Sequence, residues 1–378
     1  MLERLDAVDW SAVYHAYGPA TDTPASLRML LDADPEQRQR AYRHLFAILL
    51  DDSLRNQATA AAAPFLVELI DDPHTPDRAA LLGMLACSVA GPFTVASPAI
   101  LDDGGPHVHP ILRDIYRAAE LAVPAGLQLV EAADERLSVI AIYFLATQWR
   151  RADAIVPALH ARLYQSPTAV VRAIIAFALG QLRPEDPELA ALHAHDPDAT
   201  VRAIAAAALL HRAGAVPERV LDALIAVIEA RDDLAGLEQL PCIELGVTDF
   251  ARALCAVPPA AGARAIPPLI AALQRTTGFA TLDLVEALLH FAFGDPPPPA
   301  ADEDDGAPGP APATLMPEQR RVLTAVLAAP HLWQLGDLFF VLKAHRLPAT
   351  RSALAELLAA PAPLRPQPHD RAARPQRP

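Results

Sequence analysis

Aromatic residues are scarce in this sequence: Phe, Trp and Tyr make up 5% of its 378 residues, although 52% of the residues are hydrophobic. The core must therefore be built from Ala, Leu, Val and Ile. Alanine and leucine favour helices, whereas strands are enriched in aromatic and β-branched residues. This composition predicts closely packed helices, and the length is enough for two or three ordinary domains.

Cysteine is also rare, and Cys87, Cys242 and Cys255 are the only three. Their number is odd and no two have the Cys-x-x-Cys spacing, so nothing indicates a disulfide framework. No leader with a charged and then an apolar segment precedes the first predicted helix. We therefore expect a reduced protein in the cytoplasm.

One stretch without charge, residues 79–101, raises the question of a membrane span. Gly91, Pro92 and Pro98 interrupt it, and proline in the interior of a helix removes a hydrogen bond and breaks the helix. A membrane span needs about 20 consecutive apolar residues. We expect instead a buried helix that ends near Ala90 and a loop after it.

Positive charge is in deficit, with 31 basic against 45 acidic residues and a net charge of -14. Such a charge disfavours a general attraction to nucleic-acid phosphates or to an anionic membrane. Lys343 is the only lysine, and Ala, Pro and Arg are abundant. This bias is typical of the base composition of a genome, so the number of arginines says little about function. We expect neither a nucleic acid nor a membrane as partner.

The apolar residues repeat with a helical period. Stripes spaced i, i+3, i+4, i+7, i+8 begin at Leu137, Val171 and Val201, about 30 to 34 residues apart. Turn and N-cap residues precede each stripe, namely Asp134, Ser166-Pro167-Thr168 and Asp196-Pro197-Asp198. Each stripe is therefore predicted to be a helix with a defined start.

A second set of helices is predicted between these, and it is marked by proline. Pro64, Pro157 and Pro268 each follow two residues after an apolar stripe begins, and Pro124 has the equivalent place after Ala122. Proline fits there near a first turn or at a kink. Two alternating helix types, repeated every 30 to 35 residues, are typical of an α-solenoid.

At this level of detail the sequence resembles the HEAT-repeat family, whose first helix carries a proline and whose second helix follows an Asp-rich turn with an Arg soon after. The best copies are residues 166–180, with Arg172, and residues 196–210, with Arg202, whereas the Leu137 helix has Ser138 at this place. The opening residues 10–18 and the segment 60–70 are also similar to the start of bacterial HEAT-repeat proteins. The resemblance implies an all-α fold, an armadillo-like superhelix of about seven or eight hairpins over residues 30–360.

Two segments interrupt this pattern. Residues 295–314 hold four consecutive prolines and the acidic run Asp302-Glu303-Asp304-Asp305, and residues 361–378 are rich in Pro and Arg. Such segments bury too little apolar surface to order themselves. We predict a solenoid over 1–294, a disordered linker over 295–314, helical hairpins completing the solenoid over 315–360, and a disordered tail over 361–378.

Metal sites are the first chemistry to test, because HEAT-like deoxyhypusine hydroxylases bind iron through His-Glu pairs. None of the thirteen histidines here precedes a glutamate. His193 and His195, next to Asp196, would point to different sides of a helix. His107 and His109, with Asp102 and Asp103, lie in a loop that supplies no scaffold for further ligands. We predict no metal and no cofactor.

Motifs for nucleophilic catalysis are missing as well. The sequence has no Gly-x-Ser-x-Gly elbow and no Gly-rich phosphate loop. HEAT-like DNA-repair enzymes rely on a basic groove, whereas this chain is acidic, and no residue marks the chemistry of the HEAT-like lyases that attach bilins. We therefore predict that the protein is not an enzyme.

Aromatic residues gather near the two ends of the predicted array, at Trp10, Tyr14 and Tyr17 and again at Trp333, Phe339 and Phe340. Terminal repeats must close an exposed apolar face. We expect these side chains to cover the ends of the core; binding of a ligand is the alternative.

The expected function is that of a monomeric scaffold or adaptor that binds a protein or peptide on the concave face lined by the second helices. Arg172 and Arg202 are the candidate partner-binding residues. The alternative is a structural ladder in which these arginines pair with turn acids such as Asp198. A HEAT-like enzyme or cofactor handler, resembling the bilin lyases or dependent on a metal, is the alternative function.

Overall fold

A computed structural model describes residues 2–50, 55–90, 110–165, 167–210, 217–229, 247–296 and 315–359. Within these ranges the only strands are β1 (Tyr14–His15) and β2 (Gly18–Pro19), which pair antiparallel with Tyr14 opposite Pro19. The rest consists of helices and their connections, so the expected all-α class is confirmed. In the same ranges no helix has the length and apolar character that crossing a membrane requires.

The chain divides into two compact units, Met1–Val257 and Pro258–Pro378. This division falls inside the expected domain over 1–294. The helices of the first unit are α1 (Thr23–Met29), α2 (Pro35–Leu49), α3 (Gln57–Asp71), α4 (Arg78–Ala90), α5 (Pro110–Glu120), α6 (Val123–Leu129), α7 (Glu135–Ala146), α8 (Ala152–Tyr164), α9 (Ala169–Leu182), α10 (Pro187–His195), α11 (Ala199–Leu209), α12 (Glu218–Glu229) and α13 (Val247–Leu254).

The second unit contains α14 (Pro259–Gly262), α15 (Ile266–Leu273), α16 (Thr281–Phe293), α17 (Pro317–Ala328), α18 (Leu338–Ala344) and α19 (Arg351–Ala359). Helix α16 packs against α15, α17 and α18, and α17 packs against α19. Except for Asp295 and Pro296, the expected linker lies outside the described residues, as does the expected tail.

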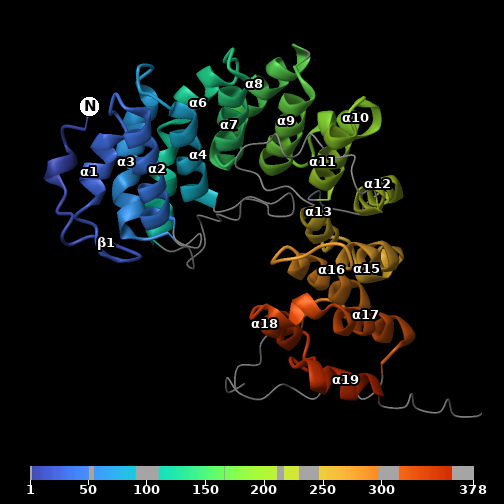
Figure 1. The fold of residues 1–378 in the computed structure, drawn as a ribbon. Coiled ribbons are helices and arrows are strands. Elements are labelled where there is room, and N and C mark those ends of the chain that lie inside the picture. Colours follow the sequence, from blue (N-terminus) through green and yellow to red (C-terminus); the bar gives the residue numbers. More distant parts are fainter. Residues whose placement is uncertain are drawn as a thin grey trace, which may run out of the picture. The chain divides into compact units, whose positions relative to one another are not determined.

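Consecutive helices of the first unit pack as pairs, and the pairs follow one another (Figure 1). Helices α3 and α4, α6 and α7, α8 and α9, and α10 and α11 each form a pair. The second helices also pack on each other, α4 on α7, α7 on α9, and α9 on α11. Each second helix therefore has neighbours on several sides.

The predicted helix starts are confirmed at the cap residues. Asp134 accepts hydrogen bonds from the backbone N–H groups of the first turn of α7, Thr168 does so for α9 and Asp198 for α11. Such caps satisfy N–H groups that have no partner inside the helix. A residue with a short polar side chain before an apolar stripe was thus a sound signal.

The marker prolines were expected near a first turn or at a kink, and only two of the four lie in a first turn. Helix α3 begins at Gln57 and α8 at Ala152, so Pro64 and Pro157 lie inside these helices. The helices start before their apolar stripes because polar and small residues extend the first turns. In contrast, Pro124 and Pro268 lie in the first turns of α6 and α15.

The second helices α7, α9 and α11 are buried around their whole circumference. Every residue is buried from Ser138 to Ala146 in α7, from Ala173 to Gly180 in α9 and from Ala203 to Leu209 in α11. Small residues allow this close packing: a Cβ on Gly180 would lie 2.5 Å from the Cβ of Ala208. A helix that is apolar all round is a core helix.

The expectation that the terminal aromatic residues cover the core is wrong for most of them. Trp10 is buried, packs 6.3 Å from Phe65 between ring centroids and donates its indole N–H to the carbonyl of Leu5. The side chains that lie on the surface instead are Tyr14, Tyr17, Phe339 and Phe340. They belong to the β1–β2 hairpin and to the short helix α18, whose buried side chains are Leu338 and Leu342.

Candidate functional site

The side chain of Arg172, in the first turn of α9, binds to the turn before α11. Its Nε donates to Oδ2 of Asp196 at 2.7 Å and its Nη2 to Oδ1 at 2.9 Å, while Nη1 donates to the carbonyl of Pro167 at 2.8 Å. The Asp196 side chain is only 3% exposed. These hydrogen bonds to Asp196 raise the pKa of Arg172. This bidentate pair joins two consecutive helix pairs.

Arg202 and Asp198 hold the same turn together from the other side. Arg202 donates from Nη1 to the carbonyls of Asp196, at 2.7 Å, and Pro197, at 2.9 Å. Asp198 accepts from the backbone N–H groups of α11 and makes no ion pair with Arg172 or Arg202. The acid that pairs is Asp196, two residues before the one expected.

The same turn occurs before α2, where the sequence analysis did not single it out. Arg38 donates from Nη1 to the carbonyls of Asp32 and Ala33, at 3.0 and 3.1 Å, and Asp34 caps the helix. Its Nε donates to Oδ2 of Asp77, ahead of α4, at 2.7 Å. Asp-x-Asp-x-x-x-Arg, shared by residues 32–38 and 196–202, is the signal that could have found it.

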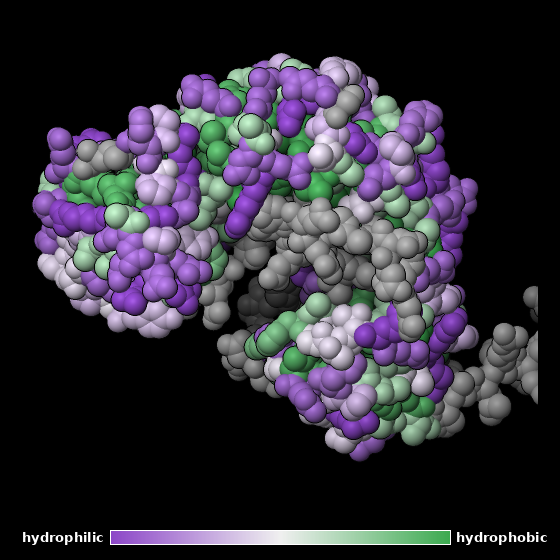
Figure 2. Space-filling view, turned by 45° about the horizontal axis from the view of Figure 1, so that its top comes forward, coloured by the Kyte–Doolittle hydropathy of each residue, from purple (hydrophilic) through white to green (hydrophobic). Residues whose placement is uncertain are grey.

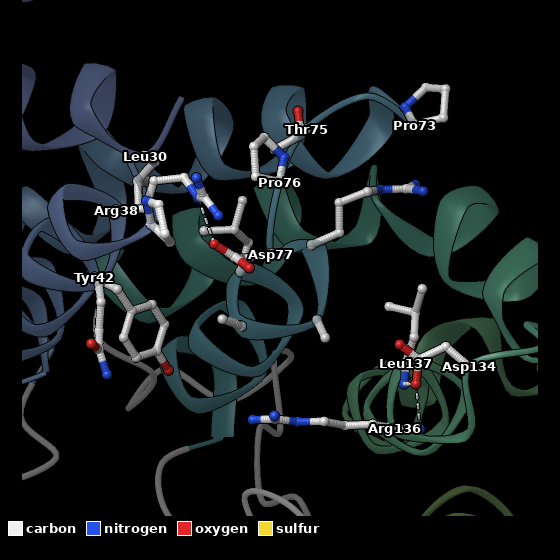
Figure 3. Close-up of a pocket in the computed structure, with 16 residues that line it drawn as sticks. Leu30, Arg38, Tyr42, Pro73, Thr75, Pro76, Asp77, Asp134, Arg136 and Leu137 are labelled. Atoms are coloured by element: carbon white, nitrogen blue, oxygen red, sulfur yellow. Dashed lines mark hydrogen bonds and ion pairs between the residues drawn. The ribbon is translucent and has the colours of Figure 1, made fainter. Parts of the chain in front are cut away.

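A groove of about 750 Å³ lies in the first unit, at the N-terminal parts of α2, α4 and α7 (Figure 3). Helix α2 forms one side, the turn between α3 and α4 crosses it, and the start of α7 forms the other side. Its apolar lining includes Leu30, Pro35, Pro73, Pro76, Ala79 and Leu137. Figure 2 shows one face of the molecule, on which hydrophobic side chains show between predominantly hydrophilic ones.

The polar side chains of the groove are engaged in different ways. Asp77 pairs with Arg38, and Asp134 accepts from the backbone N–H groups of Arg136 and Leu137. Nε of Arg78 donates to the carbonyl of Ile70 at 2.8 Å. Both carboxylates therefore already have partners.

Arg136 differs from the other arginines of the groove. Its side chain is exposed and has neither an ion pair nor a hydrogen bond to any residue that the structure describes. In Figure 3 it extends away from Asp134 and Leu137, toward the side of the groove where Tyr42 lies. An acidic protein thus presents, beside an apolar lining, a cation that no described residue pairs with.

The histidines considered as metal ligands do not meet in the structure. Nδ1 of His193 lies 3.4 Å from the carbonyl of Arg202, and burial lowers the pKa of this imidazole. Asp196, next to His195, is occupied by Arg172. The loop candidates His107, His109, Asp102 and Asp103 lie outside the described residues. Across the described ranges no group of three His, Cys, Asp or Glu side chains is arranged to hold a metal.

One polar cluster near the N-terminus was not foreseen. Asp22 receives His15 Nε2 at 3.2 Å and His44 Nε2 at 2.9 Å on its two carboxylate oxygens. Burial alone would raise the pKa of Asp22, but the hydrogen bonds from both histidines outweigh it and lower this pKa. The cluster fastens the β1–β2 hairpin to α2, and its residues are too far apart in sequence to suggest a contact.

Comparison with known proteins assigns no family: no family model matches the chain, and no curated protein matches it significantly.

Proposed function

We propose that this protein is a HEAT-like α-solenoid that acts as an adaptor and binds an extended segment of a partner protein, without catalysis. The ordered pairs of helices support the solenoid, because each second helix packs on the next one. The arginine pairs Arg38–Asp77 and Arg172–Asp196 support it further, since each joins one helix pair to the next. Solenoids of this kind offer extended surfaces to partners.

The groove at α2, α4 and α7 is the observation that carries the proposal. We place the binding surface away from α7, α9 and α11, the second helices expected to line the concave face, because the middles of these helices are buried. The groove, in contrast, combines an apolar lining with a few polar groups, as binding sites do. Its volume of about 750 Å³ accommodates a short peptide segment.

The working state of this adaptor is a monomer in the cytoplasm. The three cysteines are an odd number without the Cys-x-x-Cys spacing, which suits a reducing compartment. The net charge of -14 favours a protein partner over a nucleic acid or an anionic membrane.

The test uses a variant that fills the groove without touching the core. Ala79 lies half-buried in the lining, so Ala79→Trp places a large ring in the groove. Ala161→Trp, on the exposed side of α8, is the matched control. Tagged full-length protein is used to capture partners from the native lysate, followed by mass spectrometry and metal analysis.

We expect wild type and Ala161→Trp to retain a stoichiometric protein companion, and Ala79→Trp to lose it. Equal retention by both variants would reject the groove as the binding surface. A bound metal or chromophore without a protein companion would reject the adaptor and favour the enzyme or cofactor handler.

A further inference from the structure

We propose that the groove of α2, α4 and α7 selects an acidic segment, in which carboxylate side chains alternate with apolar ones, and that Arg136 receives a carboxylate. This inference rests on the proposed adaptor function and specifies its partner. It follows from the lining of the groove and from the pairing of its charges.

The apolar part of the lining defines what lies beside the carboxylate. Leu30 and Leu81 are buried beneath the groove, and Ala79 and Leu137 are half-buried in its lining. Ala79 and Leu137 still expose apolar surface that a ligand would remove from water. A segment made of charged residues alone would leave that surface uncovered, so apolar side chains must accompany the charge.

The charges of the groove decide the sign of the ligand. Asp77 is neutralised by Arg38 across 2.7 Å, and Asp134 is occupied by two backbone N–H groups. The lining holds three arginines, Arg38, Arg78 and Arg136, against these two carboxylates, so the net charge of the groove is positive and favours an acidic ligand. The guanidinium of Arg136 has no partner in the described part of the chain, so it is the charged group that a ligand can satisfy.

One unpaired guanidinium favours a carboxylate over a phosphate group. One guanidinium carries a single positive charge, which one carboxylate balances, whereas a phosphate group carries about -1.5 to -2 at pH 7. Recognition of phosphopeptides commonly uses a cluster of arginines. Here Arg38 and Arg78 already donate to Asp77 and to the carbonyl of Ile70, respectively. A single carboxylate is thus the anion that fits.

The probes are two fluorescein-labelled peptides with blocked ends, Leu-Glu-Leu-Glu-Leu and its neutral match Leu-Gln-Leu-Gln-Leu. Their binding to the full-length protein is followed by fluorescence anisotropy at low ionic strength. The variants are Arg136→Gln and, as control, Arg117→Gln, which removes an exposed arginine from α5 outside the groove. Neither arginine side chain forms an ion pair or a hydrogen bond with a residue that the structure describes.

The glutamate peptide is expected to bind wild type about tenfold more tightly than the glutamine peptide. Arg136→Gln removes this preference, Arg117→Gln keeps it, and Ala79→Trp weakens both peptides. Equal binding of the two peptides, absence of binding, or an equal loss with Arg117→Gln would overturn the inference. The adaptor function is tested separately, by capture of the protein companion. If Ala79→Trp loses this companion and Arg136→Gln keeps it, the adaptor function stands but the preference for an acidic segment is rejected.

Discussion

The turn before α11 and the turn before α7 begin with the same cap chemistry but differ in how they use arginine. Before α11, Arg172 and Arg202 both donate into the turn, and the nearly buried Asp196 is shared between them. Before α7, Ser138 replaces the arginine and donates to the carbonyl of Val130 at 2.6 Å. Arg136 remains unpaired at the rim of the groove, within the described residues. One turn is closed by its arginines, whereas the other leaves an arginine for a ligand.

The free energy of unfolding should change most when an aspartate is removed. We compare Asp196, in the turn before α11 (the closed edge), with Asp77, in the groove (the open edge). Asp196→Ala leaves the Arg172 guanidinium without its carboxylate in a half-buried site, and breaking such a pair costs about 3 kcal/mol of unfolding free energy. Asp77 is 58% exposed, so Asp77→Ala should cost less than about 1 kcal/mol. Urea unfolding measures both, and equal costs would contradict the distinction between a closed and an open edge.

Close packing of the second helices is tested at Gly180. Gly180→Ala forces a Cβ to within 2.5 Å of the Cβ of Ala208. Overpacking of this kind typically costs about 1 to 3 kcal/mol, and the better helix propensity of alanine offsets about 1 kcal/mol of it. Thermal unfolding should show a lower Tm, which Ala208→Gly in the same chain should restore. No recovery in the double variant would mean that the contact with Ala208 is not the cause.

The roles of the arginines are compared by replacing Arg202, in the turn before α11, and Arg136, in the groove, with neutral glutamine. Arg202→Gln loses two charge-assisted hydrogen bonds to carbonyls and is expected to cost about 1 to 2 kcal/mol. Arg136→Gln loses no contact with the described residues and should remain within about 0.5 kcal/mol of wild type. Both values come from urea unfolding. A large loss for Arg136→Gln would show that this arginine is structural.

The smallest effect is a pH dependence at the closed edge. Burial lowers the pKa of His193, so below pH 6.5 the unfolded chain binds a proton that the folded chain does not. Stability should therefore fall as the pH drops from 6.5 toward the folded-state pKa of His193. Melting curves between pH 7 and 5.5 should show a shallower decline for His193→Asn. The exposed His74 serves as control, and a similar change with His74→Asn would refute the assignment to His193.

Sequence reasoning succeeded where the signal is local. The caps Asp134, Thr168 and Asp198 lie at the predicted helix starts, because a cap acts on N–H groups two or three residues away. Helix α4 was expected to end near Ala90, and the structure describes it as far as Ala90; the loop expected after it lies outside the described residues. Such features need no knowledge of the partner helix.

Sequence reasoning failed where a side chain meets a residue far along the chain. The partner of Arg172 is Asp196 and that of Arg38 is Asp77, separated by 24 and 39 residues. Tyr14 and Tyr17 were expected to cover the core and lie on the surface. The groove was not foreseen either, because its lining comes from three segments that only the packing of helix pairs brings together.

The sequence by itself determined that the chain is helical, where several of its helices begin, and that their apolar stripes repeat. These properties follow from composition, periodicity and caps, which act over a few residues. The tertiary structure decided which helices are buried all round, which arginines close a turn, and that Arg136 has no partner among the described residues. Burial and charge pairing depend on distances between helices, and the linear order of residues does not contain these distances.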